Sequence, residues 1–142
     1  MIKQTVFAIS QDQTKPILMG ELLEIVDGNI SLVAIDGYRL AVRSCSVNNS
    51  MNNAKVIIPG KTLNEISKIL SGDAESMVLI FFTDNHVIFE FNNTTVVSRL
   101  IEGEYFKIEQ MLSSDYETKV RINKKELLSC IDRATLLVKE GD

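Results

Sequence analysis

Short runs of apolar residues, separated by clusters of turn-forming residues, occupy most of this chain. Runs of this length, rich in Val, Ile, Leu and Phe and bounded by Asp, Asn or Gly, predict β-strands. The predicted strands are residues 17–25, 30–35, 38–47, 55–59, 77–82, 86–91 and 94–101. Turn residues such as Asp27-Gly28, Thr83-Asp84-Asn85 and Asn92-Asn93 separate neighbouring runs, which predicts antiparallel hairpins.

The stretch LVAIDGYRLAVR at residues 32–43 predicts a hairpin whose turn is Asp36-Gly37. A two-residue turn of type I′ needs positive φ at both central residues, and Asp-Gly suits it. In the strand that follows, alternate residues predict one apolar face and one face with guanidinium groups. The first set is Tyr38, Leu40 and Val42, and the second is Arg39, Ala41 and Arg43. Ile35, Tyr38 and Arg39 place an apolar group, a ring and a cation around the turn, which is more than a connection needs.

Two stretches have the apolar spacing of a helix. The first is residues 1–11, with apolar side chains at Ile2, Val6, Phe7 and Ile9. The second, KTLNEISKILSG, has Thr62 as a candidate N-cap and Glu65 three residues on, as in a capping box. Gly72 is the expected end of this helix.

The order of predicted elements recurs along the chain. KVIIPGKTL at residues 55–63 matches KVRINKKEL at residues 119–127, and residues 2–10 can be laid on residues 131–139. The two offsets, 64 and 129 positions, predict a repeat of about 64 residues in the order strand, helix, strand, strand, strand. The period places the opening strand of the first copy before Met1, and the third copy stops after its helix. We therefore expect the chain to be a piece of a longer repeat protein.

These patterns predict an α+β fold in which helices cover one face of antiparallel sheets. The 142 residues are enough for one domain with a real core, and a net charge of −4 argues against a surface that is basic all over. The longest apolar runs are far shorter than the roughly 20 residues of a membrane-spanning helix, and no leader pattern begins the chain. We expect a cytoplasmic protein with no membrane association.

The sequence contains no recognisable catalytic or metal-binding motif. Cys45 and Cys130 are isolated cysteines, and His86 does not complete a zinc set with them, so we expect no metal and no disulfide. No GxSxG, HExxH or complete phosphate-binding glycine loop is present, and we expect neither catalysis nor a cofactor. Lys61 and Lys68 are seven residues apart and share a helix face, which is either an ordinary solvated face or a surface for phosphate groups.

Several segments together resemble the β subunit of bacterial DNA polymerase III, the sliding-clamp family. They are ILMGELLEIVDGNISLVAIDGYRLAVRSCSV, KVIIPGKTLNEISKIL, VSRLIEGEYF and KKELLSCIDRATLLVKEG. The DGYRLAV core, combined with the later IEGEYF segment, is specific, and the match extends over essentially the whole chain. The resemblance implies the DNA-clamp fold, with the middle domain at residues 1–115, lacking its first strand, and the opening strand and helix of the third domain at residues 116–142.

This resemblance implies that the protein is a non-enzymatic processivity factor of DNA replication. Family members form head-to-tail homodimeric rings of six similar domains that encircle duplex DNA and tether the polymerase. The implied partners are double-stranded DNA, bound without sequence preference, the polymerase III catalytic subunit, the clamp loader and other proteins with a clamp-binding motif. The implied DNA-contact candidates are Lys3, Lys15, Lys61 and Lys68.

The resemblance also implies a pocket for a short linear peptide at the DG-aromatic-RL turn. Carried over by position, the pocket residues are Leu18, Ile35, Gly37, Tyr38, Arg39, Leu40, Phe106, Gln110 and Met111. Apolar walls would accept leucine- or phenylalanine-type anchors. The family usually has proline, aspartate and arginine where this chain has Phe106, Lys107 and Gln110, so we expect a rim of different shape that lacks one cation.

Two other functions are compatible with the residues alone. One is a repeat-built β-rich protein-interaction domain with no DNA role, in which the lysines are ordinary surface. The other is an enzyme of unknown type, which the absence of a catalytic set disfavours. Projection of Lys15, Lys61 and Lys68 from a common face would favour the clamp function.

Overall fold

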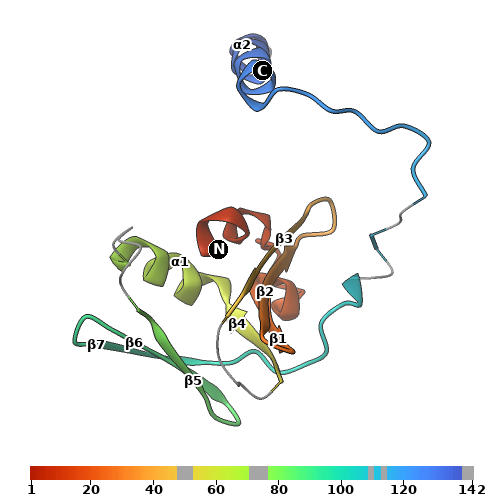
Figure 1. Cartoon of the computed structure of the whole chain (residues 1–142). Coiled ribbons are helices and arrows are strands. Elements are labelled where there is room, and N and C mark those ends of the chain that lie inside the picture. Colours follow the sequence, from red (N-terminus) through yellow and green to blue (C-terminus); the bar gives the residue numbers. More distant parts are fainter. Residues whose placement is uncertain (48–52, 71–76, 109–110, 113–114, 139–142) are drawn as a thin grey trace. The chain divides into compact units, whose positions relative to one another are not determined.

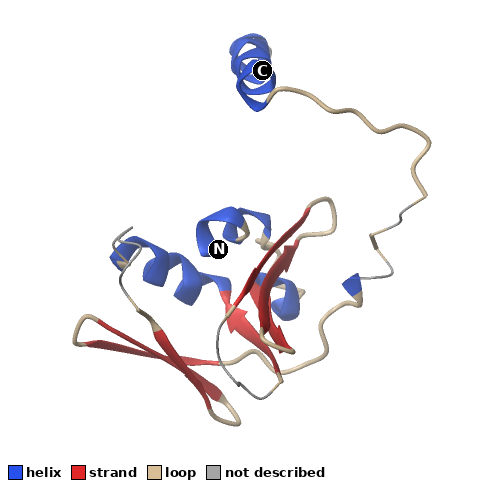
Figure 2. Ribbon diagram, viewed as in Figure 1, coloured by secondary structure: helices blue, strands red, loops and turns tan. Residues whose placement is uncertain are grey.

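The computed structural model describes residues 1–47, 53–70, 77–108, 111–112 and 115–138, which form two compact units, Met1–Phe106 and Lys107–Asp142 (Figure 1). The 3₁₀-helical turns of the first unit are η1 (Ile2–Gln4), η2 (Val6–Ala8) and η3 (Pro16–Met19). Its strands are β1 (Gly20–Val26), β2 (Asn29–Ile35), β3 (Leu40–Ser46), β4 (Ala54–Pro59), β5 (Leu79–Phe82), β6 (His86–Phe91) and β7 (Thr94–Arg99). Its α-helix is α1 (Gly60–Ile69), and the second unit contains α2 (Lys124–Val138). These elements confirm the predicted α+β class, as Figure 2 shows.

The strands form two antiparallel sheets, which we call sheet A and sheet B. Sheet A has the order β3-β2-β1-β4, and sheet B has the order β5-β6-β7. Each sheet contains a three-strand meander that follows a helical segment, β1 to β3 after the N-terminal turns and β5 to β7 after α1. The strand β4 precedes α1 in sequence but pairs with β1, so it joins the meander of the preceding repeat.

One core lies between the two sheets and α1. Leu23 and Leu32 are cross-strand partners on one face of sheet A, which we call its inner face. They pack with Leu63 and Ile66 of α1 and with Phe89 of β6, and each of these side chains is almost fully buried. The alternate side chains of sheet A point to its opposite, outer face. Sheet A therefore presents a different set of side chains on each of its faces.

The N-terminal segment differs from the single helix that its spacing predicts. Two 3₁₀ turns, η1 and η2, flank Thr5, whose backbone φ and ψ are −129° and −39°. The Thr5 hydroxyl donates to the carbonyl oxygen of Ile2 (3.2 Å), and the Thr5 N–H donates to the same oxygen (3.0 Å). These i to i+3 bonds replace α-helical ones. Similarly, Pro16 begins the turn η3, so β1 begins at Gly20 and not at residue 17.

Helix α1 forms where it is predicted, but its predicted capping box is wrong. The N-cap is Pro59, which offers no side-chain cap, and Thr62 lies inside the helix with its hydroxyl 2.7 Å from that of Ser98. Glu65 instead accepts a hydrogen bond from Lys68 (2.7 Å). The predicted stop, Gly72, lies outside the described residues.

Strand β3 also turns a different face to the core than its sequence predicts. Ala41 is buried at 8% exposure, whereas Val42 is 46% exposed. Ala41 pairs with Ala34 across the ladder, and both pack against Ala8 of η2. The close approach of the N-terminal segment leaves room only for alanine there, so small residues, and not the larger Val42, mark the buried side.

The second unit contains helix α2 and little else that is regular. Asn123 begins it, because its side-chain oxygen accepts a hydrogen bond from the N–H of Lys125 (2.9 Å). Residues 119–122, where the repeat places a strand, form no strand here, and none of the described residues of this unit is buried. Among the described helices, none combines the length and the apolar character needed to cross a membrane.

Candidate functional site

The connection between β2 and β3 is a four-residue loop and not the predicted two-residue turn. Ile35 pairs with Leu40, so Asp36 to Arg39 lie between the strands. Only Gly37, with φ of +95°, has a positive φ in this loop. The Asp36 N–H donates to the Arg39 carbonyl oxygen (3.2 Å) and closes the loop.

Positive φ at two successive residues, as a type I′ turn requires, occurs at two of the other turn signals. Asp27 and Gly28 have φ of 48° and 76° between paired residues of β1 and β2. Asn92 and Asn93 have φ of 47° and 58° between β6 and β7. Both are tight connections that satisfy the twist of the strands.

The Asp36 carboxylate holds the longer loop in place. Its Oδ1 accepts hydrogen bonds from the N–H groups of Tyr38 (3.0 Å) and Arg39 (2.9 Å). Its Oδ2 accepts from Arg39 Nη2 (2.6 Å) and Nε (2.8 Å), which makes a two-point ion pair. The N–H groups of Tyr38 and Arg39, and then the guanidinium, lower the pKa of Asp36 to about 2. The loop therefore keeps its cap across the physiological pH range.

This cap leaves the side chain of Tyr38 free. Tyr38 is 99% exposed, which is unusual for an aromatic residue between two strands. The guanidinium of Arg39 lies 5.9 Å from the ring centroid of Phe7, itself 57% exposed. Sequence reasoning assigned Phe7 to a helical stripe and missed this contact, since no local pattern links η2 to the β2–β3 loop.

The outer face of sheet A is closed at the same end by Tyr105. Its hydroxyl donates to the carbonyl oxygen of Val33 (3.3 Å), with that of Gly20 at 3.4 Å. Burial raises the pKa of Tyr105 to about 12. Gly103 has φ of +136°, and a Cβ there would lie 2.7 Å from Ile17 Cδ1, so the segment leading to Tyr105 needs glycine to pass close to η3. Sequence reasoning also missed Tyr105, although the IEGEYF motif contains it.

Seven of the nine predicted pocket residues belong to the first unit, and they fall into three groups. Leu18 and Ile35 are buried, and Leu40 is half-buried, so these residues are part of the hairpin core at this end of sheet A. Phe106 is 48% exposed and packs edge-to-face against Tyr105, with ring centroids 6.4 Å apart. Gly37, Tyr38 and Arg39 form the loop beside them. Met111 belongs to the second unit, and Gln110 lies outside the described residues.

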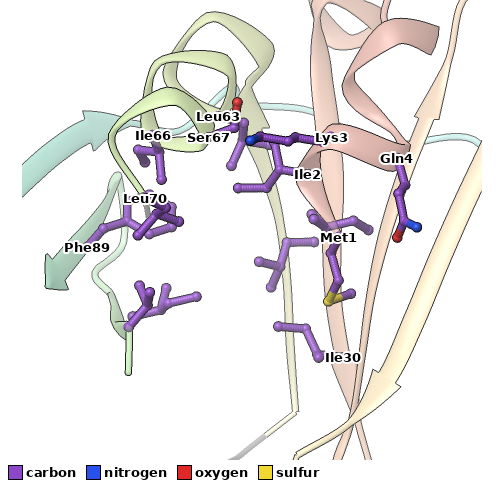
Figure 3. Close-up of a pocket in the computed structure, with 14 residues that line it drawn as sticks. Met1, Ile2, Lys3, Gln4, Ile30, Leu63, Ile66, Ser67, Leu70 and Phe89 are labelled. Atoms are coloured by element: carbon purple, nitrogen blue, oxygen red, sulfur yellow. The ribbon is translucent and has the colours of Figure 1, made fainter. Parts of the chain in front are cut away.

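The predicted DNA-contact lysines lie around α1 and the N-terminal segment. Lys61 and Asn64 of α1 line one groove together with Gln11 and Pro16, and Lys15 precedes Pro16. Lys3 lines a cavity together with two residues of α1, Leu63 and Ser67 (Figure 3). All four lysines are exposed, and Lys68 forms an exposed ion pair with Glu65 (2.7 Å).

A buried carboxyl group lies on the inner face of sheet A. Glu21 of β1 has 0% exposure, and neither of its carboxyl oxygens has a hydrogen-bond partner among the described residues. Burial raises its pKa to about 7. The sequence contains a signal for this position. Glu21, Leu23 and Ile25 are two residues apart along β1, so the Glu21 carboxyl lies on the same face as the two core residues.

The described residues contain no cluster of three or more His, Cys, Asp or Glu side chains that could hold a metal ion. Cys45 and Cys130 are free thiols. His86 is exposed at the start of β6. The site therefore consists of an apolar sheet end, a displayed aromatic ring and a cation.

A family model described as the central domain of the DNA polymerase III beta subunit matches residues 1–107. This chain belongs to the DNA polymerase III beta subunit family. The beta sliding clamp of Staphylococcus epidermidis is 41% identical over 141 residues, which is 99% of this chain and 37% of the relative. The chain thus spans little more than a third of the length of the curated relatives it matches.

Solved structures of the family share the fold. A DNA polymerase III beta subunit from Eubacterium rectale matches with a TM-score of 0.95 and 60% identity over 99% of this chain and 38% of the other. The sliding clamp of Bacillus subtilis matches with a TM-score of 0.92 and 39% identity over 99% of this chain and 37% of the other. The predicted sliding-clamp resemblance and fold are confirmed by these matches.

Proposed function

We propose that this chain supplies the middle domain of a ring-forming sliding clamp, with residues 116–142 as the opening part of the next domain. The proposed protein is a cytoplasmic, non-catalytic processivity factor that forms a homodimeric ring around duplex DNA. The support for this role is that relatives of the chain are named sliding clamps. The chain covers 37% of the length of such a relative.

The lysines around α1 support the DNA contact. Lys61 and Lys68 share one side of the helix, and Lys61 lines the same groove as Pro16, the neighbour of Lys15. A few lysines at one surface attract phosphates without reading sequence, and weak contact of this kind permits sliding. This grouping favours the clamp over an interaction domain with no DNA role.

The proposal of a partner-peptide site rests on Tyr38 and Arg39, whose side chains are exposed on a fixed backbone. The Asp36 cap fixes the backbone of both residues beside an apolar sheet end formed by Ile35 and Leu40. Exposed aromatic and arginine side chains on a fixed backbone are typical anchors of protein interfaces. The partners would be the polymerase III catalytic subunit, the clamp loader and other proteins with a clamp-binding motif.

The DNA role is tested by primer extension with a family-length protein that carries this segment. With Lys15, Lys61 and Lys68 all changed to Glu, we expect shorter products and faster loss of the protein from circular DNA, with a difference from the wild type that shrinks at high salt. The control changes Lys55, Arg99 and Lys119 to Glu, which alters the net charge equally and leaves both helices untouched. Equal loss with both triple variants, or no loss with either, would contradict the proposed contact surface.

A further inference from the structure

The two sheets of the first unit differ on their outer faces, which are turned away from the core between the sheets. On the outer face of sheet A, the cross-strand partners Leu22 and Val33 are almost fully buried, and Tyr105 binds the Val33 carbonyl oxygen there. On the outer face of sheet B, Phe81 of β5 and Val97 of β7 are 46% and 60% exposed. Apolar side chains this exposed are not covered by any described element of the chain.

The exposed side chains of sheet B form an apolar row that crosses its strands. Phe81 is the cross-strand partner of Ile88, and Ile88 is the partner of Val97. Their neighbours along β6, Val87 and Phe89, point the other way and are buried in the core. A sheet face that meets only water normally carries polar side chains, so this apolar row indicates a face that packs against another surface.

Opposite charges lie on the two sides of the apolar row. On one side, Glu90 of β6 lies in register between Leu79 and Thr95. On the other side, Arg99 of β7 is the cross-strand partner of His86. These residues are two positions from the apolar row along their strands, so they share its face. The outer face of sheet B therefore has an acidic end, an apolar middle and a basic end.

We propose that the outer face of sheet B is an interface between two copies of this chain, which pack sheet against sheet about a two-fold axis that follows the apolar row. This axis brings the two apolar rows into contact and reverses the direction of the strands. Glu90 of each copy then lies opposite the basic end of the other, so both ion pairs form by symmetry. Such a contact uses the same patch on both copies. It is separate from the β2–β3 loop, and it does not depend on the proposed clamp function.

The acidic end of this face has room for an incoming arginine. A hollow of about 460 Å³ lies there, and Leu79, Glu90 and Thr95 are among the residues that line it. The proposed axis places Arg99 of the second copy over Thr95, beside Glu90. Within its own chain, Arg99 pairs with Glu102 at 3.7 Å, and both side chains are about three-quarters exposed. An exposed pair of this length contributes little, so Arg99 can exchange it for Glu90 of another copy.

The test is analytical ultracentrifugation of this chain over a range of concentrations. One apolar row and two ion pairs make a small contact of the transient class, and we expect a dimer with a Kd of about 0.1–1 mM. Val97→Lys places a charge in the apolar row and should weaken the dimer at least about tenfold. Val42→Lys makes the same change on β3 of sheet A, where Val42 is 46% exposed, and it should leave the dimer unchanged. Circular dichroism establishes that both variants are folded.

A mixing experiment tests the two-fold arrangement itself. Glu90→Arg gives a face with a basic group at both ends, and Arg99→Glu gives a face with an acidic group at both ends. Each variant alone should associate at least about tenfold more weakly than the wild type, because like charges then face each other. An equal mixture of the two should associate about as strongly as the wild type, because every facing pair is again of opposite charge.

Three results would overturn the proposal. They are a protein that stays monomeric up to about 1 mM, a Val97→Lys variant that associates like the wild type, and a mixture of the two charge variants that associates no better than either alone. Association that survives all of these changes would place the contact on another surface of the chain, and it would overturn the proposal as well.

Discussion

Two carboxyl groups near sheet A have opposite environments. Glu21 on the inner face is fully buried, has no hydrogen-bond partner among the described residues, and has a pKa raised to about 7. Asp36, in the loop between β2 and β3, accepts four hydrogen bonds, and its pKa is lowered to about 2. The first group resists ionisation, and the second is held ionised.

The ionisation of Glu21 affects the stability of the fold, whereas the ionisation of Asp36 affects the position of an exposed loop. Ionised Glu21 lowers the stability of the fold, because a buried carboxylate without partners is poorly solvated. Ionised Asp36 fixes a loop whose side chains face solvent. Changes at Glu21 should therefore alter unfolding, and changes around Asp36 should alter binding.

The largest expected effect is the stabilisation of the protein by Glu21→Gln. Unfolded Glu titrates near 4.5 and folded Glu21 near 7, so folding takes up a proton between these values. The wild-type free energy of unfolding should therefore fall as pH rises from 4.5 through 7 and then level off. Glu21→Gln should remove this slope and be more stable by about 2–3 kcal/mol at pH 8, measured by urea denaturation.

Glu24→Gln is the control for this prediction, since Glu24 lies in the same strand and pairs with Lys55 on the outer face. It should keep the slope of the wild type. A Glu21→Gln variant with an unchanged slope would show that the carboxyl is not buried in the folded protein.

The next effect is on partner binding through the displayed ring. Tyr38→Ala and Arg39→Ala, in a family-length protein, should each weaken a clamp-binding peptide by about 1–2 kcal/mol, as interface anchors do. Isothermal titration calorimetry measures this loss. Because Tyr38 is 99% exposed, its replacement should leave the midpoint of thermal unfolding unchanged. A loss of stability equal to the loss of binding would contradict the separation of the two regions.

A smaller effect is expected where the outer face of sheet A is closed. Tyr105→Phe removes the hydroxyl that donates to Val33 and keeps the ring. It should lower the free energy of unfolding by about 1 kcal/mol. Urea denaturation below pH 9 is the measurement, and a neutral result would mean that the ring alone closes this face.

The smallest effect compares the two Asp-Gly sequences. Asp36→Asn weakens the ion pair with Arg39, and we expect about a threefold loss of peptide affinity. Asp27→Asn makes the same chemical change in the tight turn, where asparagine also tolerates positive φ, and it should leave affinity unchanged. Equal effects of the two variants would contradict a special role for the Asp36 cap.

The two Asp-Gly dipeptides show how much of this fold the sequence predicts. Alternation and turn residues located every strand of the two sheets, because these signals are local. They did not distinguish Asp27-Gly28, which forms a type I′ turn, from Asp36-Gly37, which opens a four-residue loop. In the longer loop, the Asp36 carboxylate binds the N–H groups of Tyr38 and Arg39 and the Arg39 guanidinium, and strand patterns do not report such contacts.

Sequence patterns also fail to predict features that tertiary contacts determine. The buried side of β3 is marked by Ala41, because η2 packs close to it, and size-based reasoning chose Val42. Thr62 reads as an N-cap, but the helix begins at Gly60, directly after β4. The pocket and lysine assignments come from the family resemblance, and they stay predictions until binding is measured.

The most direct test of the central claim is a titration of a labelled clamp-binding peptide with a family-length protein that carries this segment. We predict saturable binding that Tyr38→Ala weakens by about tenfold, while Asp27→Asn leaves it unchanged. Equal affinity of the wild type and Tyr38→Ala would contradict the claim that the β2–β3 loop displays a partner-binding site.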